Sequence, residues 1–263
     1  MNYALITGGS SGIGLEYARQ LAAEGWNLVV VSNRAEKNCR VAEELSCQYG
    51  VTVEPLYADL TQTDAAEKIY ARTKEMGVQV DILINNAGML LFSTLCNTPA
   101  EQLERIVALH CTTPTKLCRF FATEMGERGY GHILIMSSIT AWTPYPTISH
   151  YAATKAYLHS FAQSLWYEMR RRGVSVTAVY PSAVDTPFYD LDDKMRRLLL
   201  RCGVMLSAES VARKALRAMF RSRRRCIPGL LPKIEAALCW LLPAWALLPI
   251  LKIPAVKRIL ERI

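Results

Sequence analysis

The fold of this chain is indicated first by the run Tyr3-Ala4-Leu5-Ile6, followed by Thr7-Gly8-Gly9-Ser10-Ser11-Gly12-Ile13-Gly14. The apolar residues predict a buried strand, and the helical periodicity after the glycines predicts a helix that ends near Gly25. Between a strand and a helix, glycines permit a tight turn and a close backbone approach, and the helix N-terminus faces a pyrophosphate. Outside that context a glycine cluster is usually only a loop. Here the context predicts a nucleotide-binding turn.

The second predicted strand, Asn27 to Val31, leads into Ser32-Asn33-Arg34. A site that prefers NAD(H) usually has an acidic side chain here to hold the ribose 2′-hydroxyl, whereas a 2′-phosphate requires an arginine. The chain has no acid at this point, and Asn33 is followed by Arg34. The pattern favours NADP(H), and NAD(H) stays open because Arg34 could equally point into solvent.

Polar or small residues also follow the next two predicted strands. After the strand Thr52–Tyr57 comes Asp59-Leu60, where Asp59 either accepts a hydrogen bond from the adenine amine or closes a turn. The strand Val80–Ile84 ends at Asn85-Asn86-Ala87-Gly88. We expect the asparagines to satisfy backbone groups where the sheet splays, and Gly88 to let the backbone pass close to a ribose.

Acid/base chemistry is indicated by Ser149-His150-Tyr151-Ala152-Ala153-Thr154-Lys155, which opens a helical pattern that runs to about Arg171. Tyr151 and Lys155 are four residues apart and share one face of that helix. A neighbouring ammonium favours the phenolate and lowers the pKa of a tyrosine, whose ordinary value is near 10. Ser138 follows a strand-like run, 132–137, whose carboxyl end should face the same crevice. Because YxxxK alone is common on solvated helices, the prediction depends on this combination.

His110 lies in a helical segment, 99–128, that is kinked or broken near Pro114. A lone histidine inside a helix is either a packed or surface residue or a catalyst, and the sequence leaves both open.

The sixth predicted strand, Val174–Tyr180, is followed by Pro181-Ser182-Ala183-Val184-Asp185-Thr186. Thr186 either binds a nicotinamide carboxamide or caps a helix. Further on, Ser207 is predicted to cap a helix over 208–221, and a short strand is predicted at Cys226-Ile227.

Two C-terminal segments differ from the rest. Residues 187–206 mix aromatic and charged side chains without clean periodicity, and we interpret them as a loop that covers a substrate. Residues 229–263 are predicted to form short amphipathic helices. Positions 236–251 carry no charge but contain Pro243 and Pro249, and they are too few to span a bilayer, which takes about 20 apolar residues. This tail rests on an anionic membrane surface, on its own domain or on a second subunit.

The composition fits one large ordered α/β domain: 263 residues, 51% hydrophobic and 21% charged. The net charge of +8 is uneven, since residues 194–263 contain 16 Lys/Arg and 3 Asp/Glu. This basic region suits an anionic membrane surface or an acyl carrier. The sequence has no zinc-finger, homeodomain or RNA-binding signature, so we expect no nucleic-acid partner.

The eight cysteines form no CxxC pair and have no cluster of histidine partners. We interpret them as free thiols in a reducing cytoplasm and expect no metal site. The first strand begins at once, which leaves no room for a signal peptide. We expect a cytoplasmic protein, with any membrane contact on the cytoplasmic face.

Taken in order, TGGSSGIG, NNAG, Ser138, YxxxK and Pro-Ser-x-x-x-Thr resemble a classical short-chain dehydrogenase/reductase from residue 2 to about 228. The resemblance implies one doubly wound Rossmann domain, residues 1–228, with about seven parallel strands, followed by a helical extension, residues 229–263. It implies that Tyr151 is the general acid/base, that Ser138 orients a carbonyl, and that Lys155 binds the nicotinamide ribose and lowers the pKa of Tyr151. The tail is similar, more loosely, to the subgroup of 17β-hydroxysteroid dehydrogenases and long-chain 3-oxoacyl reductases.

Two departures from the family pattern matter. His110 occupies the fourth catalytic position, where the family has an asparagine that holds a relay water through its backbone. Because the backbone does much of that work, we expect activity to survive. After the sixth strand the family usually has Pro-Gly, whereas this chain has Pro181-Ser182. This difference could alter the cofactor loop. The residues expected to bind the cofactor are Thr7, Gly8, Ser10, Ser11, Gly12, Ile13, Gly14, Asn33, Arg34, Asp59, Leu60, Asn86, Ala87, Gly88, Tyr151, Lys155, Pro181, Val184 and Thr186.

The sequence thus predicts an NADP(H)-dependent oxidoreductase that interconverts a ketone and a secondary alcohol on a steroid or long-chain 3-oxoacyl substrate, as a homodimer or homotetramer. The alternative is a non-catalytic nucleotide-binding scaffold that docks through its basic tail. An inactive member of the family should have lost Ser138, Tyr151 or Lys155, and all three are present. The only feature that favours this alternative is His110 in place of the family's asparagine.

Overall fold

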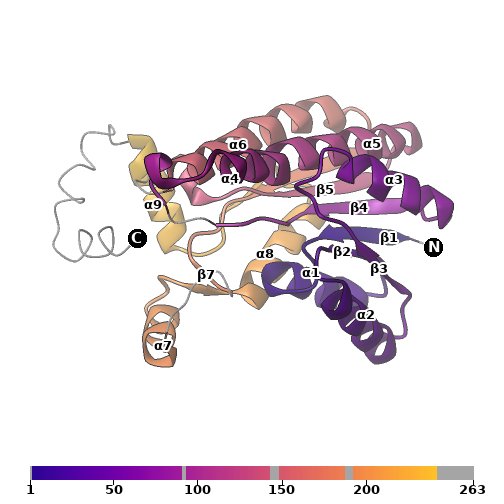
Figure 1. Ribbon diagram of the computed structural model, residues 1–263, viewed down its shortest axis with the longest axis horizontal. Helices are drawn as coiled ribbons and strands as arrows, with labels where there is room; N and C mark the ends of the chain where they lie inside the picture. The colour runs from indigo at the N-terminus through magenta and orange to yellow at the C-terminus, as the bar shows by residue number, and fades with distance from the viewer. Residues whose placement is uncertain (1, 91–92, 143–147, 187–191, 242–263) are drawn as a thin grey trace.

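Short apolar runs rich in Val, Ile and Leu become the central strands of one parallel sheet and are buried on both faces, whereas its edge strands are partly exposed. The computed structural model describes residues 2–90, 93–142, 148–186 and 192–241, and within them seven strands pair in parallel (Figure 1). Their order, β3-β2-β1-β4-β5-β6-β9, confirms the predicted Rossmann sheet. The strands are β1 Tyr3–Thr7, β2 Asn27–Ser32, β3 Val53–Tyr57, β4 Val80–Asn85, β5 Gly131–Met136, β6 Val174–Val179 and β9 Arg225–Cys226.

Helices cover both faces of the sheet, because successive side chains of a strand point to opposite faces and both sets are apolar here. In β1, Leu5 packs into the layer of α3, α5 and α6, whereas Ala4 and Ile6 pack into the layer of α1, α2 and α8 (Figure 1). The helices are α1 Gly12–Ala23, α2 Ala35–Tyr49, α3 Ala65–Glu75, α4 Ala100–Val107, α5 Thr113–Arg128, α6 Ser149–Arg170, α7 Asp193–Arg201, α8 Ala208–Phe220 and α9 Leu231–Leu241.

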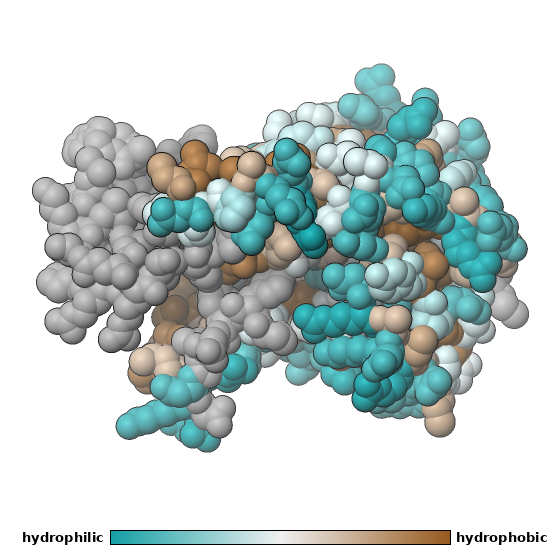
Figure 2. Space-filling view, viewed as in Figure 1, coloured by the Kyte–Doolittle hydropathy of each residue, from teal (hydrophilic) through white to brown (hydrophobic). Residues whose placement is uncertain are grey.

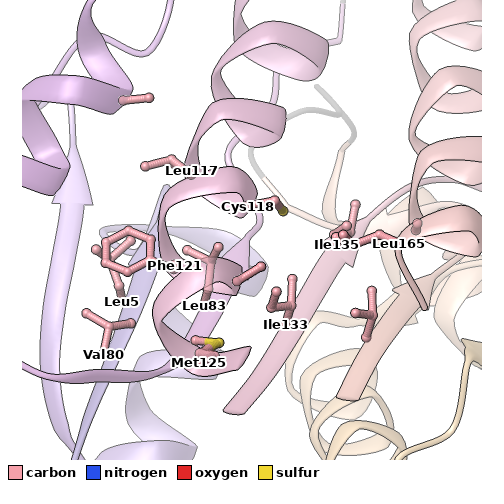
Figure 3. Close-up of a cluster of buried hydrophobic side chains, with 14 of the residues drawn as sticks. Leu5, Val80, Leu83, Leu117, Cys118, Phe121, Met125, Ile133, Ile135 and Leu165 are labelled. Atoms are coloured by element: carbon pink, nitrogen blue, oxygen red, sulfur yellow. The ribbon is translucent and has the colours of Figure 1, made fainter. Parts of the chain in front are cut away.

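The core beneath α5 packs this helix onto the sheet. Figure 3 shows Leu117, Phe121 and Met125 of this helix beside sheet residues that include Leu83 and Ile133. All five side chains are at most 1% exposed. Full burial of such a side chain contributes about 1.5–3 kcal/mol. The layer therefore stabilises the packing of α5 on the sheet.

The strand order reverses at β1, which lies between β2 and β4. Ligands of doubly wound sheets bind at this point, in the crevice outside the carboxyl ends of the strands. The glycine turn follows β1, and Asn86 to Gly88 follow β4, so both predicted nucleotide motifs flank the crevice.

The helical segment predicted over 99–128 is broken, as expected near Pro114. α4 ends at Val107, a π-helical turn spans Ala108–Thr112, and α5 begins at Thr113. Pro114 lies in the first turn of α5, where its missing N–H is tolerated. The break therefore precedes the proline, and the π-helical turn contains His110.

The segment predicted as an irregular loop, 187–206, contains helix α7, and the short strand β8 (Leu206–Ser207) follows it. Ser207 caps α8 as predicted, because its Oγ accepts a hydrogen bond from Ser210 N. α9 lies in the predicted helical extension. The predictions for 187–191 and for 242–263, with Pro243 and Pro249, fall outside the described residues. In the described part of the chain, no helix is long and apolar enough to cross a membrane.

Candidate active site

One cavity of about 690 Å³ connects the glycine turn with Ser138, Tyr151 and Lys155. Every residue predicted for the site lines it except Thr7, Gly14 and His110. The predicted residues that do line it are Gly8, Ser10, Ser11, Gly12, Ile13, Asn33, Arg34, Asp59, Leu60, Asn86, Ala87, Gly88, Ser138, Tyr151, Lys155, Pro181, Val184 and Thr186.

The glycine turn depends on backbone conformations that other residues rarely adopt. Gly8 and Gly12 have φ angles of +66° and +54°. A Cβ on Gly14 would lie 2.2 Å from Gly8 O, so only glycine lets α1 pack against the turn. Thr7 Oγ1 accepts a hydrogen bond from Asn86 N at 2.9 Å, which joins the ends of β1 and β4. Thr7 and Gly14 thus shape the turn from behind the cavity.

The end of β2 presents a cation at the rim of the cavity. Ser32 Oγ lies 2.8 Å from Ser10 Oγ and accepts a hydrogen bond from Arg34 N at 3.1 Å, which fixes the chain as it leaves the strand. The side chains of Asn33 and Arg34 are exposed and line the cavity. Within the residues that the structure describes, the Arg34 guanidinium forms no ion pair.

Asp59 shows the turn-closing role that the sequence left open, and it also lines the cavity. Its Oδ1 accepts hydrogen bonds from Thr61 N and Oγ1 at 3.0 and 2.8 Å. Partial burial raises the pKa of Asp59, but these bonds, one from Gln62 and the charge of Arg105 together lower it below its usual value. The carboxylate is therefore ionised at neutral pH.

The end of β5 fixes Ser138 and ties it to α6. Ser138 is 6% exposed, and its Oγ accepts a hydrogen bond from Thr140 N at 3.2 Å. The preceding Ser137 donates from Oγ to Lys155 O at 2.8 Å. The strand that carries Ser138 and the helix that carries Tyr151 are thus held together by a buried hydrogen bond.

Lys155 places a buried ammonium beside the ring of Tyr151. Its Nζ donates to Met136 O at 2.9 Å and lies 5.4 Å from the centre of the Tyr151 ring. The residue is 4% exposed, and burial lowers the pKa of Lys155 to about 8, against a small opposing effect of Cys111. The lysine is therefore mostly charged at pH 7. A positive charge beside a phenol favours the phenolate.

His110 lies behind the cavity wall and is 1% exposed. Its Nε2 accepts a hydrogen bond from Met89 N at 3.0 Å, and its Nδ1 lies 2.8 Å from Thr154 Oγ1. Burial, followed by the charges of Lys155 and His150, holds the pKa of His110 well below its usual range. The sequence left open whether this residue is packed or catalytic, and the structure places it as a buried, hydrogen-bonded residue that does not reach the cavity.

Thr186 lies against the glycine turn. A Cβ on Gly12 would be 3.3 Å from Thr186 Cγ2, and Thr186 Oγ1 donates to Val184 O at 3.3 Å. The alternative role as a helix cap is not seen for α7, whose N-cap is Asp192. Thr186 thus contributes to the cavity wall beside the glycine turn.

The segment after Thr186 is anchored at both ends beside the cavity. The short strand β7, Val184–Asp185, pairs in parallel with β8. Asp185 and Arg196 of α7 form an ion pair with 2.9 Å between Oδ1 and Nη1. The predicted substrate-covering segment therefore leaves and rejoins the domain at one place.

Several cavity residues have no motif that predicts them: Met89, Arg105, Leu109, Ile148 and Val204. Arg105 and Leu109 are four residues apart and precede His110, so they share one face of a helix next to the predicted break. This spacing could have predicted that both residues face the same side. The other three belong to connecting segments, and no local pattern distinguishes them. Within the described residues, no group of three or more His, Cys, Asp or Glu side chains is placed to hold a metal ion.

Comparisons with known proteins agree with this geometry. The sequence profile described as short chain dehydrogenase matches residues 2–196. The chain is 33% identical over 200 residues to 17-beta-hydroxysteroid dehydrogenase type 3 of Mus musculus, covering 74% of this chain and 64% of that protein. It is 36% identical over 183 residues to a very-long-chain 3-oxoacyl-CoA reductase of Pyricularia oryzae, covering 68% and 55%. The matched segments thus span less than two thirds of these two relatives.

A solved structure has the same fold as this chain and is similar to it in sequence to about the same degree as the two relatives above. The short-chain dehydrogenase from Sphingobium yanoikuyae in complex with NADPH superposes with a TM-score of 0.80 at 31% identity, and the match covers 91% of each chain.

Proposed function

This chain belongs to the short-chain dehydrogenase/reductase family, whose members bind NAD(P), and we propose that it is an NADP(H)-dependent oxidoreductase that interconverts a ketone and a secondary alcohol on a lipophilic substrate. The observation that carries this proposal is one cavity lined by Ser138, Tyr151 and Lys155 and continuous with the glycine turn. A hydroxyl, a phenol and an ammonium meet there at the carboxyl end of the sheet.

The residues of the crevice fit a dinucleotide. Gly8 and Gly12 keep the turn free of side chains, and α1 begins directly behind it, so backbone N–H groups and the positive end of the helix can bind a pyrophosphate. Asn86 to Gly88 would flank a ribose, and Thr186 would bind the nicotinamide carboxamide. When bound, NADP(H) supplies or accepts the hydride.

Proton transfer is assigned to Tyr151. The Lys155 ammonium lies 5.4 Å from the centre of the Tyr151 ring, and a positive charge beside a phenol favours the phenolate that a general acid/base must form. Ser138, held by Thr140 N, would donate a hydrogen bond to the substrate oxygen. Both groups act on the atom where negative charge develops, and a site fixed in advance for that charge stabilises the transition state.

The preference for NADP(H) is supported by the rim of the cavity. Arg34 is exposed beside the end of β2, where an NAD-preferring site has an acid, and the chain has Asn33 there. A guanidinium binds a 2′-phosphate through charge-assisted hydrogen bonds. Arg105 lines the same cavity and adds positive charge near Asp59. The related structure that contains NADPH supports the same cofactor.

A lipophilic substrate is supported by apolar side chains that line the cavity, among them Met89, Leu109, Ile139, Ile148 and Val204. Elsewhere on the surface, Leu198 of α7 is 54% exposed, and Leu230 just before α9 and Leu231 and Ile234 within it are 73%, 45% and 48% exposed. Figure 2 shows apolar colouring on the side of the molecule where α4 and α9 lie, while the opposite side is mostly hydrophilic. The names of the relatives point to steroids or long-chain 3-oxoacyl thioesters as the class.

The same exposed apolar side chains, with the basic C-terminal region, support contact of residues 229–263 with an anionic membrane surface. A cytoplasmic location and a homodimer or homotetramer stay predictions.

The experiment that tests the proposal is NADPH oxidation with a panel of steroids, 3-oxoacyl thioesters and small ketones. We expect turnover of at least one apolar ketone, with small polar ketones much poorer. A protein that binds NADPH tightly but reduces no carbonyl, and oxidises none of the matching alcohols with NADP⁺, would overturn the proposal in favour of the non-catalytic scaffold.

A further inference from the structure

His110 connects two parts of the cavity wall that are distant in the sequence. It lies in the π-helical turn Ala108–Thr112, and such turns frequently occur at functional sites. On one side of the imidazole is the backbone of Met89, which lines the cavity, and on the other is Thr154 of α6. The ring also packs edge-on against Tyr151, with 5.6 Å between ring centroids and an interplanar angle of 77°.

The direction of each hydrogen bond follows from the groups involved. Met89 N can only donate, so Nε2 of His110 accepts and carries no proton. Thr154 Oγ1 donates its single proton to Tyr151 O at 2.7 Å, so it must accept from His110 Nδ1 at 2.8 Å. Only the neutral tautomer protonated on Nδ1 satisfies both ends of the ring. The chain of bonds ends on the backbone carbonyl of Tyr151.

The surroundings leave the imidazole no alternative arrangement. A Cβ on Gly88 would lie 3.1 Å from His110 Nε2, so glycine at this position lets the ring approach the backbone. An imidazolium would turn a second N–H towards Met89 N, and burial disfavours that charged form.

We infer that His110 is a positioning residue: its neutral Nδ1–H tautomer clamps the Met89 backbone to Thr154 and thereby fixes the turn of α6 that carries Tyr151. The inference rests on the proposed function, since it concerns the alignment of the phenol with a bound carbonyl. His110 itself touches neither substrate nor cofactor. Misplacing a reacting group by about 1 Å can cost roughly 100-fold in rate.

The test removes the acceptor of the His110 Nδ1 proton without changing the shape of the site. In Thr154→Val, we expect kcat to fall about 10- to 100-fold while KM for NADPH changes less than about threefold, because alignment and not binding is lost. Thr154→Ser keeps the hydroxyl and should retain most of kcat. Thr73→Val is a matched control: Thr73 is 0% exposed and donates to Tyr70 O at 2.7 Å in the same i to i−3 geometry, far from the cavity. It should lower stability and leave kcat unchanged.

A second measurement reads the tautomer without turnover. Long-range ¹H–¹⁵N NMR of the four histidines should show His110 protonated on Nδ1 at neutral pH, with its assignment taken from a His110→Gln spectrum. A proton on Nε2, an imidazolium, or a Thr154→Val enzyme with the kcat of the wild type would overturn the inference. A wild type that reduces no carbonyl but shows the Nδ1–H tautomer would overturn the proposed function and support the clamp.

Discussion

Replacing Lys155 by methionine tests whether burial of this ammonium makes the protein less stable. Lys155 is 4% exposed, and burial lowers its pKa from 10.5 to about 8. Because a tenfold change in proton affinity corresponds to about 1.4 kcal/mol, folding with a charged Lys155 costs about 3 kcal/mol. Methionine removes the charge and keeps the length and apolar character of the side chain. The variant also loses the hydrogen bond from Lys155 to Met136 O, which reduces the expected gain in stability by about 1 kcal/mol.

We therefore expect Lys155→Met to raise the free energy of unfolding by about 2 kcal/mol at pH 7, while abolishing turnover. The pH dependence separates the charge from the packing. The unfolded lysine keeps its proton up to about pH 10.5, whereas the folded one loses it near pH 8, so the unfolded state binds more protons between these values. Wild-type stability relative to the variant should accordingly rise by about 2–3 kcal/mol between pH 7 and pH 10.

The assay is reversible urea unfolding of nucleotide-free protein, followed by tryptophan fluorescence at both pH values. Lys37→Met, on the exposed side of α2, is the matched control, because it makes the same chemical change in solvent. Its effect should be small and independent of pH. The reasoning is refuted if Lys155→Met is no more stable than the wild type at pH 7, or if the difference between them is the same at pH 7 and pH 10.

Three further predictions concern the chemistry, the cofactor and the tail. Tyr151→Phe should lower kcat by at least about 100-fold with little change in NADPH affinity, because the ring still packs but the transferable proton is gone; activity within about tenfold of the wild type would remove Tyr151 from this role. The wild type should bind NADPH more tightly than NADH, and Arg34→Ala should weaken NADPH binding by about 10- to 100-fold while leaving NADH nearly unaffected; equal dissociation constants for the two nucleotides would contradict the cofactor assignment. Sedimentation with anionic vesicles should be salt-sensitive and lost on deletion of 229–263, and a protein that ignores both anionic and neutral vesicles would refute membrane contact.

The fold and most of the candidate site could be predicted from the sequence because the features that specify them are local. A buried parallel strand needs a continuous apolar run, and a tight turn before a helix needs glycine, as at Gly8 and Gly12 with their positive φ angles. Tyr151 and Lys155 share a helix face through their spacing alone. Each of the other predicted motifs comes directly after a strand, and a doubly wound sheet brings the carboxyl ends of its strands to one edge.

The contacts that these residues make depend on the three-dimensional packing of the chain. Arg105 and Leu109 line the cavity, and the chain between α4 and α5 forms a π-helical turn that Pro114 indicated only approximately. The partners of His110 come from a loop after β4 and from α6, 21 and 44 residues away. The lowered pKa of Lys155 is a consequence of burial, which depends on everything packed around it. Such contacts join segments distant in sequence, and they are fixed by the packing of helices on the sheet, which no local pattern encodes.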